Sequence, residues 1–251
     1  MGEIPPLIWA KLKWAARHAQ TTSDEIARFA EREPYHFSLD VDTEKREQLF
    51  RLRTVETPPP EIALGIGDTI HNLRATLDHL AWFLALQKSP TPPRKTEFPI
   101  FWREADYLRD SPAKLRGIPT PAHTIIESVQ PYHRGHEAAA KRDPLWIIHQ
   151  LDIDDKHRLP TLVAMAAGGG GTWVPPRGVV EINPNPLDEG AVIMKVVFPE
   201  GIDLQVDVEP DLTFQIAFGK ESAASGGHVM ATLVQLGKAV EGVVRKFSDF
   251  F

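Results

Sequence analysis

One long segment, residues 61–87, constrains the fold of this chain more than any other. Its apolar residues recur every three or four positions, which is helical spacing: Ile62, Ile66, Ile70, Leu73, Leu77, Leu80 and Leu84. Pro60 suits the first turn of a helix, and a proline-rich run that begins at Ser89 ends it. Because the second half is apolar on nearly every side, we expect this helix to be buried.

Four polar residues interrupt the apolar helix, namely Asn72, Arg74, Asp78 and His79. A helix turns about 100° per residue, so Asn72 and His79 lie on one flank of the leucine stripe, and Arg74 and Asp78 lie on the other. Arg74 and Asp78 are four residues apart and can form an ion pair. Since a buried charge without a partner is strongly destabilising, the pattern predicts either a buried polar network or a functional site.

A second predicted helix carries a carboxylate inside its apolar stripe. Asp143-Pro144 has the composition of a cap and first turn, and the helical spacing continues to about Ala167. Asp155 falls between the stripe residues Leu151 and Leu159, where a core residue is expected. We therefore expect Asp155 to pack against Arg74 or His79.

The rest of the chain alternates between helical and strand spacing. A helix is expected at 7–32, with a kink or a break near Thr21–Ser23, and strand alternation at about 34–56 predicts a β-hairpin. Ser111-Pro112 favours the start of another helix, and a further helix is expected at 123–130. Short β-prone runs separated by turns then precede a final helix from Gly227: Val179–Ile182, Ala191–Phe198, Leu204–Val208 and Phe214–Phe218.

These elements predict an α+β protein with a bundle-like helical core, a β-hairpin after the first helix, and a C-terminal antiparallel sheet followed by a final helix. We expect residues 1–167 to be mainly helical and residues 172–251 to be β-rich, ending in the last helix. Both parts are expected to pack as one compact unit.

Composition excludes several classes of site. The chain of 251 residues has no cysteine, so disulfides, thiolate chemistry and cysteine zinc sites are impossible. Its formal net charge of −6 disfavours broad, non-specific binding of nucleic acid. The N-terminus lacks the pattern of a secretory signal, and no apolar run is long enough to cross a membrane. We therefore expect a cytoplasmic protein without membrane contact.

The spacing from Arg74 to His79, an arginine followed by four residues and a histidine, resembles the Arg-x4–6-His signature of HEPN domains. These are all-helical modules common in bacterial toxin and antiviral systems. The resemblance implies metal-independent cleavage of RNA in a cleft that a dimer usually forms. It implies that Arg74 contacts the phosphate and that His79 is the general base or acid, roles that suit a guanidinium and an imidazole.

A wider pattern resembles a family of bacterial proteins that carries no assigned activity with it. The pattern combines the helix string around Gly67–Trp82 with Gln130-Pro131-Tyr132 and with the string from Leu151 to Arg158. This second resemblance implies no reaction.

Three hypotheses follow for the same residues. In the first, a HEPN-like endoribonuclease uses Arg74 and His79, with Asn72 and Asp78 beside them. It needs no cofactor or metal, takes RNA as its partner and acts as a homodimer; Lys156, His157 and Arg158 bind ligand together with Asp155. In the second, Arg74, Asp78, His79 and Asp155 form a buried polar network in a non-catalytic binding or structural protein. In the third, a metal ion gathers several of these side chains, namely His71, Asp78, His79, Asp155 and His157.

Overall fold

The computed structural model describes residues 3–54, 56–168, 179–183, 185–204 and 212–251. The chain divides into two compact units, each built from separate stretches of sequence. We call residues 1–23, 63–160 and 230–251 the helical unit, and residues 24–62 and 161–229 the sheet unit. These units differ from the division expected near residues 167–172, because each unit is assembled from distant stretches of the chain.

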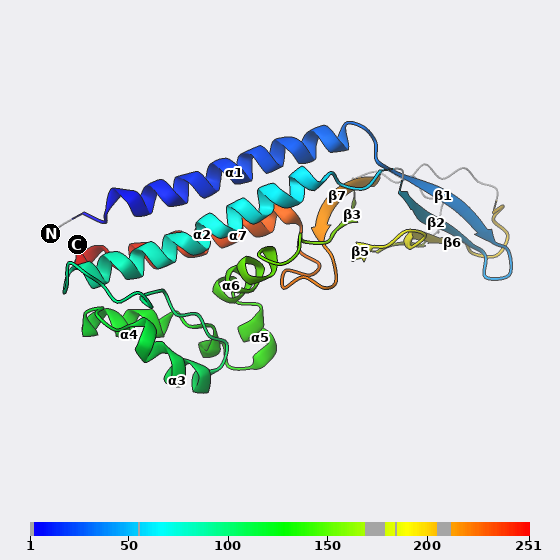
Figure 1. Ribbon diagram of the computed structural model, residues 1–251. Helices are drawn as coiled ribbons and strands as arrows, with labels where there is room; N and C mark the ends of the chain where they lie inside the picture. The colour runs from blue at the N-terminus through cyan, green and yellow to red at the C-terminus, as the bar shows by residue number, and fades with distance from the viewer. Residues whose placement is uncertain (1–2, 55, 169–178, 184, 205–211) are drawn as a thin grey trace. The chain divides into compact units, whose positions relative to one another are not determined.

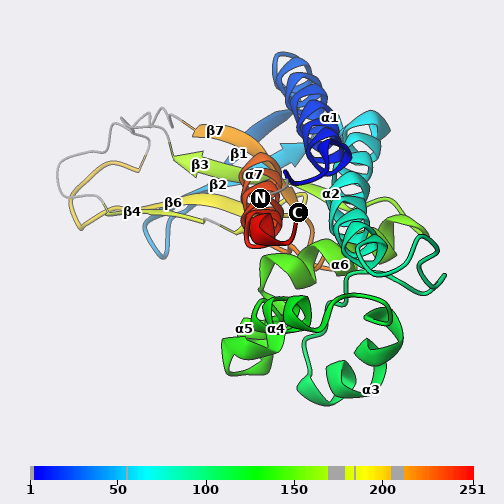
Figure 2. The same cartoon turned by 90° about the vertical axis from the view of Figure 1, so that its left-hand side faces the viewer.

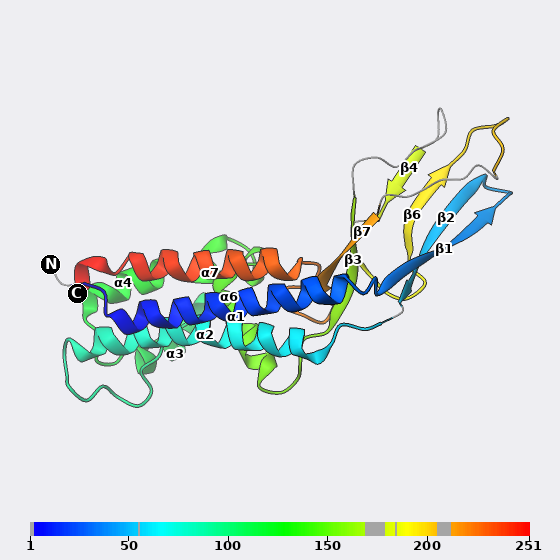
Figure 3. The ribbon, with the colours of Figure 1, turned by 90° about the horizontal axis from the view of Figure 1, so that it is seen from above.

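Three long helices lie side by side and dominate the helical unit (Figures 1 and 3). They are α1 (Pro6–Ala30), α2 (Pro60–Leu86) and α7 (Val229–Arg245), and the end of α1 and the start of α2 belong to the sheet unit. Shorter helices α3 (Glu104–Lys114), α4 (Thr120–Ser128), α5 (Glu137–Lys141) and α6 (Pro144–Asp155) complete the helical unit. In Figure 2 these shorter helices gather together, with α6 nearest to α2. Single turns of 3-10 helix span Pro131–Arg134 and Ser248–Phe250.

The leucine stripe of α2 forms the centre of this core, as its spacing predicts. Every member of the stripe is at most 2% exposed, and Thr76 and Ala81 on neighbouring positions are fully buried. At about 25 cal/mol per Å² of apolar surface, burying such side chains is the main favourable term in folding. None of the described helices is long and apolar enough to cross a membrane.

The sheet unit contains two antiparallel sheets. The first has the order β1-β2-β6-β4, formed by β1 (Tyr35–Asp42), β2 (Glu47–Thr54), β6 (Val192–Val197) and β4 (Val179–Ile182). The second has the order β5-β3-β7, formed by β5 (Pro186–Leu187), β3 (Leu162–Gly168) and β7 (Leu212–Phe218). In the first sheet, Phe50 of β2 and Met194 and Val196 of β6 form a buried apolar cluster with Phe198. The α+β class, the hairpin and the antiparallel sheets are thus confirmed.

Three local predictions are wrong, each for a physical reason. The helix predicted to reach Ala167 ends at Asp155, because Pro160 cannot continue it and Leu162–Gly168 pairs instead with β7. No break divides α1, since the Thr21 and Thr22 hydroxyls donate to carbonyls one turn earlier and leave the helix intact. Ser111-Pro112 lies near the end of α3 rather than at its start. The strand expected at Leu204–Val208 falls mostly outside the described residues.

Gly67 of α2 lies in close contact with the Asp155 side chain of α6. A Cβ atom placed on Gly67 would come within 2.2 Å of Asp155 Oδ1, which is far inside van der Waals contact. A glycine inside a helix is usually destabilising relative to alanine, so its presence here is explained by this contact.

We expect Gly67→Ala to lower the free energy of unfolding by about 1–3 kcal/mol, because the new methyl group displaces the Asp155 side chain. Gly242→Ala on α7 is the matched control, since a Cβ atom placed on Gly242 would meet nothing within 4 Å. That control should raise stability by about 0.5–1 kcal/mol. Urea denaturation of both variants checks the pair, and equal effects would contradict the proposed contact.

Candidate functional site

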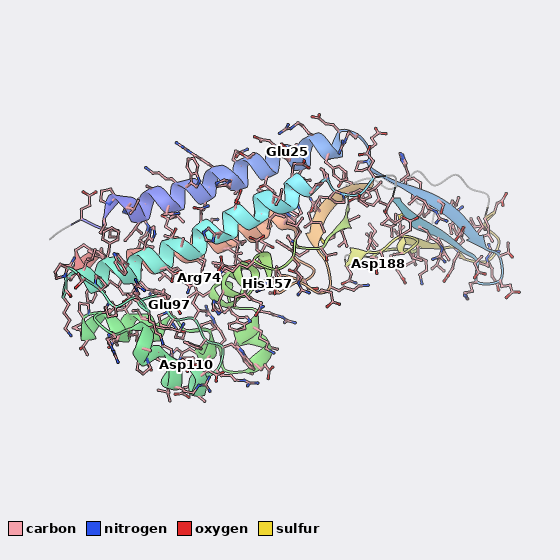
Figure 4. All side chains as sticks on the ribbon, viewed as in Figure 1. Glu25, Arg74, Glu97, Asp110, His157 and Asp188 are labelled. Atoms are coloured by element: carbon pink, nitrogen blue, oxygen red, sulfur yellow. The ribbon has the colours of Figure 1, made fainter. Side chains whose placement is uncertain are left out.

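Arg74 lies at the centre of a closed set of hydrogen bonds in the helical unit. Its Nη1 donates to Asp78 Oδ1 at 2.7 Å, and its Nη2 donates to the Phe98 carbonyl at 2.9 Å. The same Asp78 oxygen accepts from the Phe98 backbone N–H at 3.0 Å. We call these three residues the Arg74 clamp. Figure 4 shows Arg74 on α2, above the segment that carries Glu97.

The clamp holds a segment outside any helix or strand, residues 98–100, which pairs with none of the described strands. Phe98, Pro99 and Ile100 are buried, so their backbone groups need partners from side chains. Gln130, itself only 2% exposed, supplies two more hydrogen-bond partners. Its Nε2 donates to the Pro99 carbonyl, and its Oε1 accepts from the Phe101 N–H. The role of Gln130 was not predicted, although the sequence string that contains it was singled out.

His79 and Asn72 lie on the other flank of α2, toward α1. Lys11 of α1 donates to Asn72 Oδ1 at 3.3 Å, while the Asn72 amide nitrogen donates to the Asp68 carbonyl. His79 is half-buried, and its Nδ1 is buried without a hydrogen-bond partner among the described residues. Burial, reinforced by the charge of Lys11 and partly opposed by Asp78, lowers the pKa of His79. This histidine is therefore neutral near pH 7.

Two carboxylates of α6 approach α2, and the one nearer to Arg74 is Asp152, so the prediction that Asp155 packs against Arg74 or His79 is wrong. Asp152 is 7% exposed, approaches His71 Nδ1 at 3.2 Å, and accepts from Lys156 Nζ at 2.7 Å. Asp155 lies instead against Gly67, one turn nearer the start of α2. The two helices therefore run in opposite directions here, which a stripe count on either helix alone cannot reveal.

The residues predicted to bind ligand, Asp155 to Arg158, have different surroundings, although Asp155 and Arg158 both line a small cavity beside α2. Burial, with the negative charges of Asp152 and Asp68, raises the pKa of Asp155. Arg158 lies 3.7 Å from Asp154, and His157 is exposed just beyond the end of α6 (Figure 4). Of the predicted binding residues, only Lys156 contacts the polar groups beside α2.

His149 on α6 is a second histidine held neutral, and sequence spacing gave no sign of it. Burial, together with the charges of Arg74 and Lys114, lowers its pKa to about 4, while Asp152 acts in the opposite direction. Lys114 is itself paired with Glu97, on the segment that the Arg74 clamp holds. Positive charge is thus concentrated between α2, α3 and α6, with carboxylates beside it.

The geometry separates the side chains that a metal site would bring together. Within the described ranges, no group of three or more histidine and carboxylate side chains is arranged to hold a metal ion. His71 pairs with Asp152, Asp78 pairs with Arg74, and Asp155 packs at Gly67. The third hypothesis, a metal ion bound by His71, Asp78, His79, Asp155 and His157, is therefore not supported.

The neutral histidines predict that acid destabilises the protein. Because the pKa of His149 is lower in the folded state than its ordinary 6.5, the unfolded chain takes up the proton first as the pH falls. The free energy of unfolding therefore loses nothing to His149 above pH 6.5. It falls as the pH approaches 4, and this residue accounts for at most about 3 kcal/mol of the loss.

Thermal or urea unfolding of wild type and His149→Gln across this pH range measures the effect. The variant should have a flatter profile, whatever its absolute stability. His79 and His228, whose pKa values are also lowered, contribute in the same direction in both proteins. The raised pKa of Asp155 acts oppositely at the acidic end. Parallel profiles for the two proteins would contradict the assignment to His149.

Comparisons with known proteins found no relative of this chain. No protein-family model, no curated protein and no solved structure matches the chain. The resemblance to HEPN domains therefore stays a prediction, and the function is argued from the side chains alone.

Proposed function

We propose that this chain is a non-catalytic binding protein in which the Arg74 clamp is part of the framework. The observation that carries this proposal is the state of the Arg74 side chain, which is 8% exposed with both terminal nitrogens already bonded. A guanidinium that recognises phosphate must present those nitrogens to the ligand. Here they hold Asp78 and the Phe98 backbone instead.

A metal-independent endoribonuclease that uses Arg74 and His79 is the second candidate. One observation favours it, since a neutral His79 could accept a proton from the 2′-hydroxyl of RNA. Against it, Arg74 is bonded toward Phe98 while His79 lies toward α1. One subunit therefore does not direct both groups at one phosphate, and a second subunit would have to complete the cleft.

A cavity in the sheet unit is the best place for a ligand. It has a volume of about 390 Å³, within the usual range for small-molecule sites, and lies between the end of α1, the start of β1, and β7. Apolar side chains form most of its wall: Ile26, Phe29, Ala30, Tyr35, Phe214 and Ile216. The Tyr35 ring lies 5.9 Å from Phe29 and 5.4 Å from Phe214, centroid to centroid. These walls suit a small, mainly apolar and aromatic molecule.

Tyr35 adds a polar group to this wall. Its side chain is buried, its hydroxyl has no hydrogen-bond partner among the described residues, and burial raises its pKa to about 12. Buried hydroxyls are nearly always paired, so this one is available to a ligand that carries a hydrogen-bonding group.

The clamp and the nuclease make opposite predictions for Arg74→Met. If the clamp is structural, the variant should lose on the order of 3 kcal/mol of stability, because Asp78 and Phe98 lose their partner. Wild type should leave single-stranded RNA intact in EDTA, and His79→Gln should behave like wild type. His157→Ala, at an exposed site, is the stability control. RNA cleavage by wild type that disappears in a normally melting His79→Gln protein would establish the nuclease instead.

The cavity can be tested with N-phenyl-1-naphthylamine, a neutral apolar dye whose fluorescence rises on binding. Ala30→Phe should weaken dye binding by at least about tenfold, because the added ring fills the cavity. Ala27→Phe is the matched control, since Ala27 is also on α1 but does not line the cavity. Equal binding by both variants, or none by wild type, would exclude this site.

A further inference from the structure

The strand β1 presents one unpaired edge in the described structure. Among the described strands it pairs only with β2, in a register that runs from Tyr35 opposite Thr54 to Asp42 opposite Glu47. Figure 3 shows it at the margin of its sheet. The backbone N–H and C=O groups on its outer side can therefore pair with another strand.

The side chains of this edge strand are unusually apolar on one face. Phe37, Leu39 and Val41 are 40%, 46% and 46% exposed. They lie opposite Leu52, Phe50 and Gln48 of β2, which are buried, and the Phe37 ring packs edge-on against Phe50 at 5.5 Å. The exposed row thus continues the core of the first sheet. Edge strands are usually protected by charges or prolines on such a face, and β1 has neither there.

The other face of β1 carries polar residues, two of them acidic. It carries His36, Ser38, Asp40 and Asp42, and Asp40 is paired with Arg51 of β2 at 2.6 Å. Two acidic residues directly opposite one another would be unfavourable, so this face restricts the registers in which a strand can pair with β1.

We propose that β1 pairs with β1 of a second copy of this chain, in antiparallel register centred on Leu39. Two-fold symmetry requires antiparallel strands and places each residue opposite its mirror position. Leu39 then faces the partner's Leu39, and Phe37 faces the partner's Val41, so the whole exposed apolar row is covered. On the other face, His36 lies opposite the partner's Asp42 and Ser38 lies opposite the partner's Asp40.

Neighbouring registers are worse. A shift by one position would place the apolar face of one strand beside the polar face of the other, because side chains alternate along a strand. A centre at Asp40 sets two aspartates against each other. A centre at Ser38 places Val41 opposite Tyr35, which is only 8% exposed and gains little from being covered. It also places Asp42 opposite Pro34, which has no N–H to donate. The register centred on Leu39 pairs the three exposed apolar residues only with one another and sets no like charges opposite each other.

The absence of cysteine makes the register directly measurable. Under mild oxidation, Leu39→Cys should form a covalent dimer, because this residue faces itself across the axis. Ser38→Cys and Phe37→Cys should each stay largely monomeric in denaturing gels, whereas a mixture of Phe37→Cys and Val41→Cys should give a mixed dimer. Leu108→Cys, at a 62% exposed site on α3, controls for random collision. Efficient cross-linking of Ser38→Cys but not Leu39→Cys would overturn the register.

Sedimentation equilibrium of the untagged full chain tests the association itself. Wild type should dimerise, and Leu39→Lys should raise the dimer dissociation constant by at least about tenfold, because it places like charges opposite one another. Leu108→Lys should leave the constant unchanged, and thermal melting confirms that each variant is folded. A wild type that stays monomeric at all accessible concentrations would overturn the proposal, as would one whose dimer tolerates Leu39→Lys. Neither result depends on dye binding or on RNA cleavage.

Discussion

The bond between Arg74 and Asp78 is the interaction on which the helical unit depends. It places an ion pair on the flank of α2, where the Arg74 side chain is 8% exposed and could not remain unpaired without a large desolvation penalty. The pair is stabilised because it also satisfies both backbone groups of Phe98. The segment 98–100, which pairs with none of the described strands, can therefore stay buried against α2. Gln130 satisfies the following backbone groups in the same way, at the Pro99 carbonyl and the Phe101 N–H.

The polar groups of α2 serve two separate surfaces, and this division shapes the functional argument. On one flank, Asn72 and His79 lie toward Lys11 of α1. On the other, Arg74 holds Phe98, while His71 reaches Asp152 of α6. A single motif read along the helix combines residues that lie in different environments. The lowered pKa values of His79 and His149 follow mainly from burial, which explains them without a catalytic role.

Sequence periodicity predicted the elements whose signal is local. The stripe of α2, the alternation in β1 and β2, and the Asp143-Pro144 start of α6 all follow from spacing and capping, and Asp143 does accept from the Leu145 N–H. The end of α6 was missed because Leu159 and Leu162 fit a helical stripe equally well, and only pairing with β7 made the latter part of a strand. The choice of Asp152 over Asp155 depends on how two helices cross. The division into units depends on contacts between distant segments, which local sequence patterns do not reveal.

The interleaving of the two units has a consequence for synthesis on the ribosome. The helical unit begins with α1, but α7, its third long helix, is translated only after every strand of the sheet unit. The sheet unit, bounded by residue 229, has its full complement of strands sooner. The leucines of α2 therefore stay without part of their packing surface until α7 has emerged from the ribosome. Nascent chains of this protein are consequently expected to rely on chaperones that shield apolar helices during this interval.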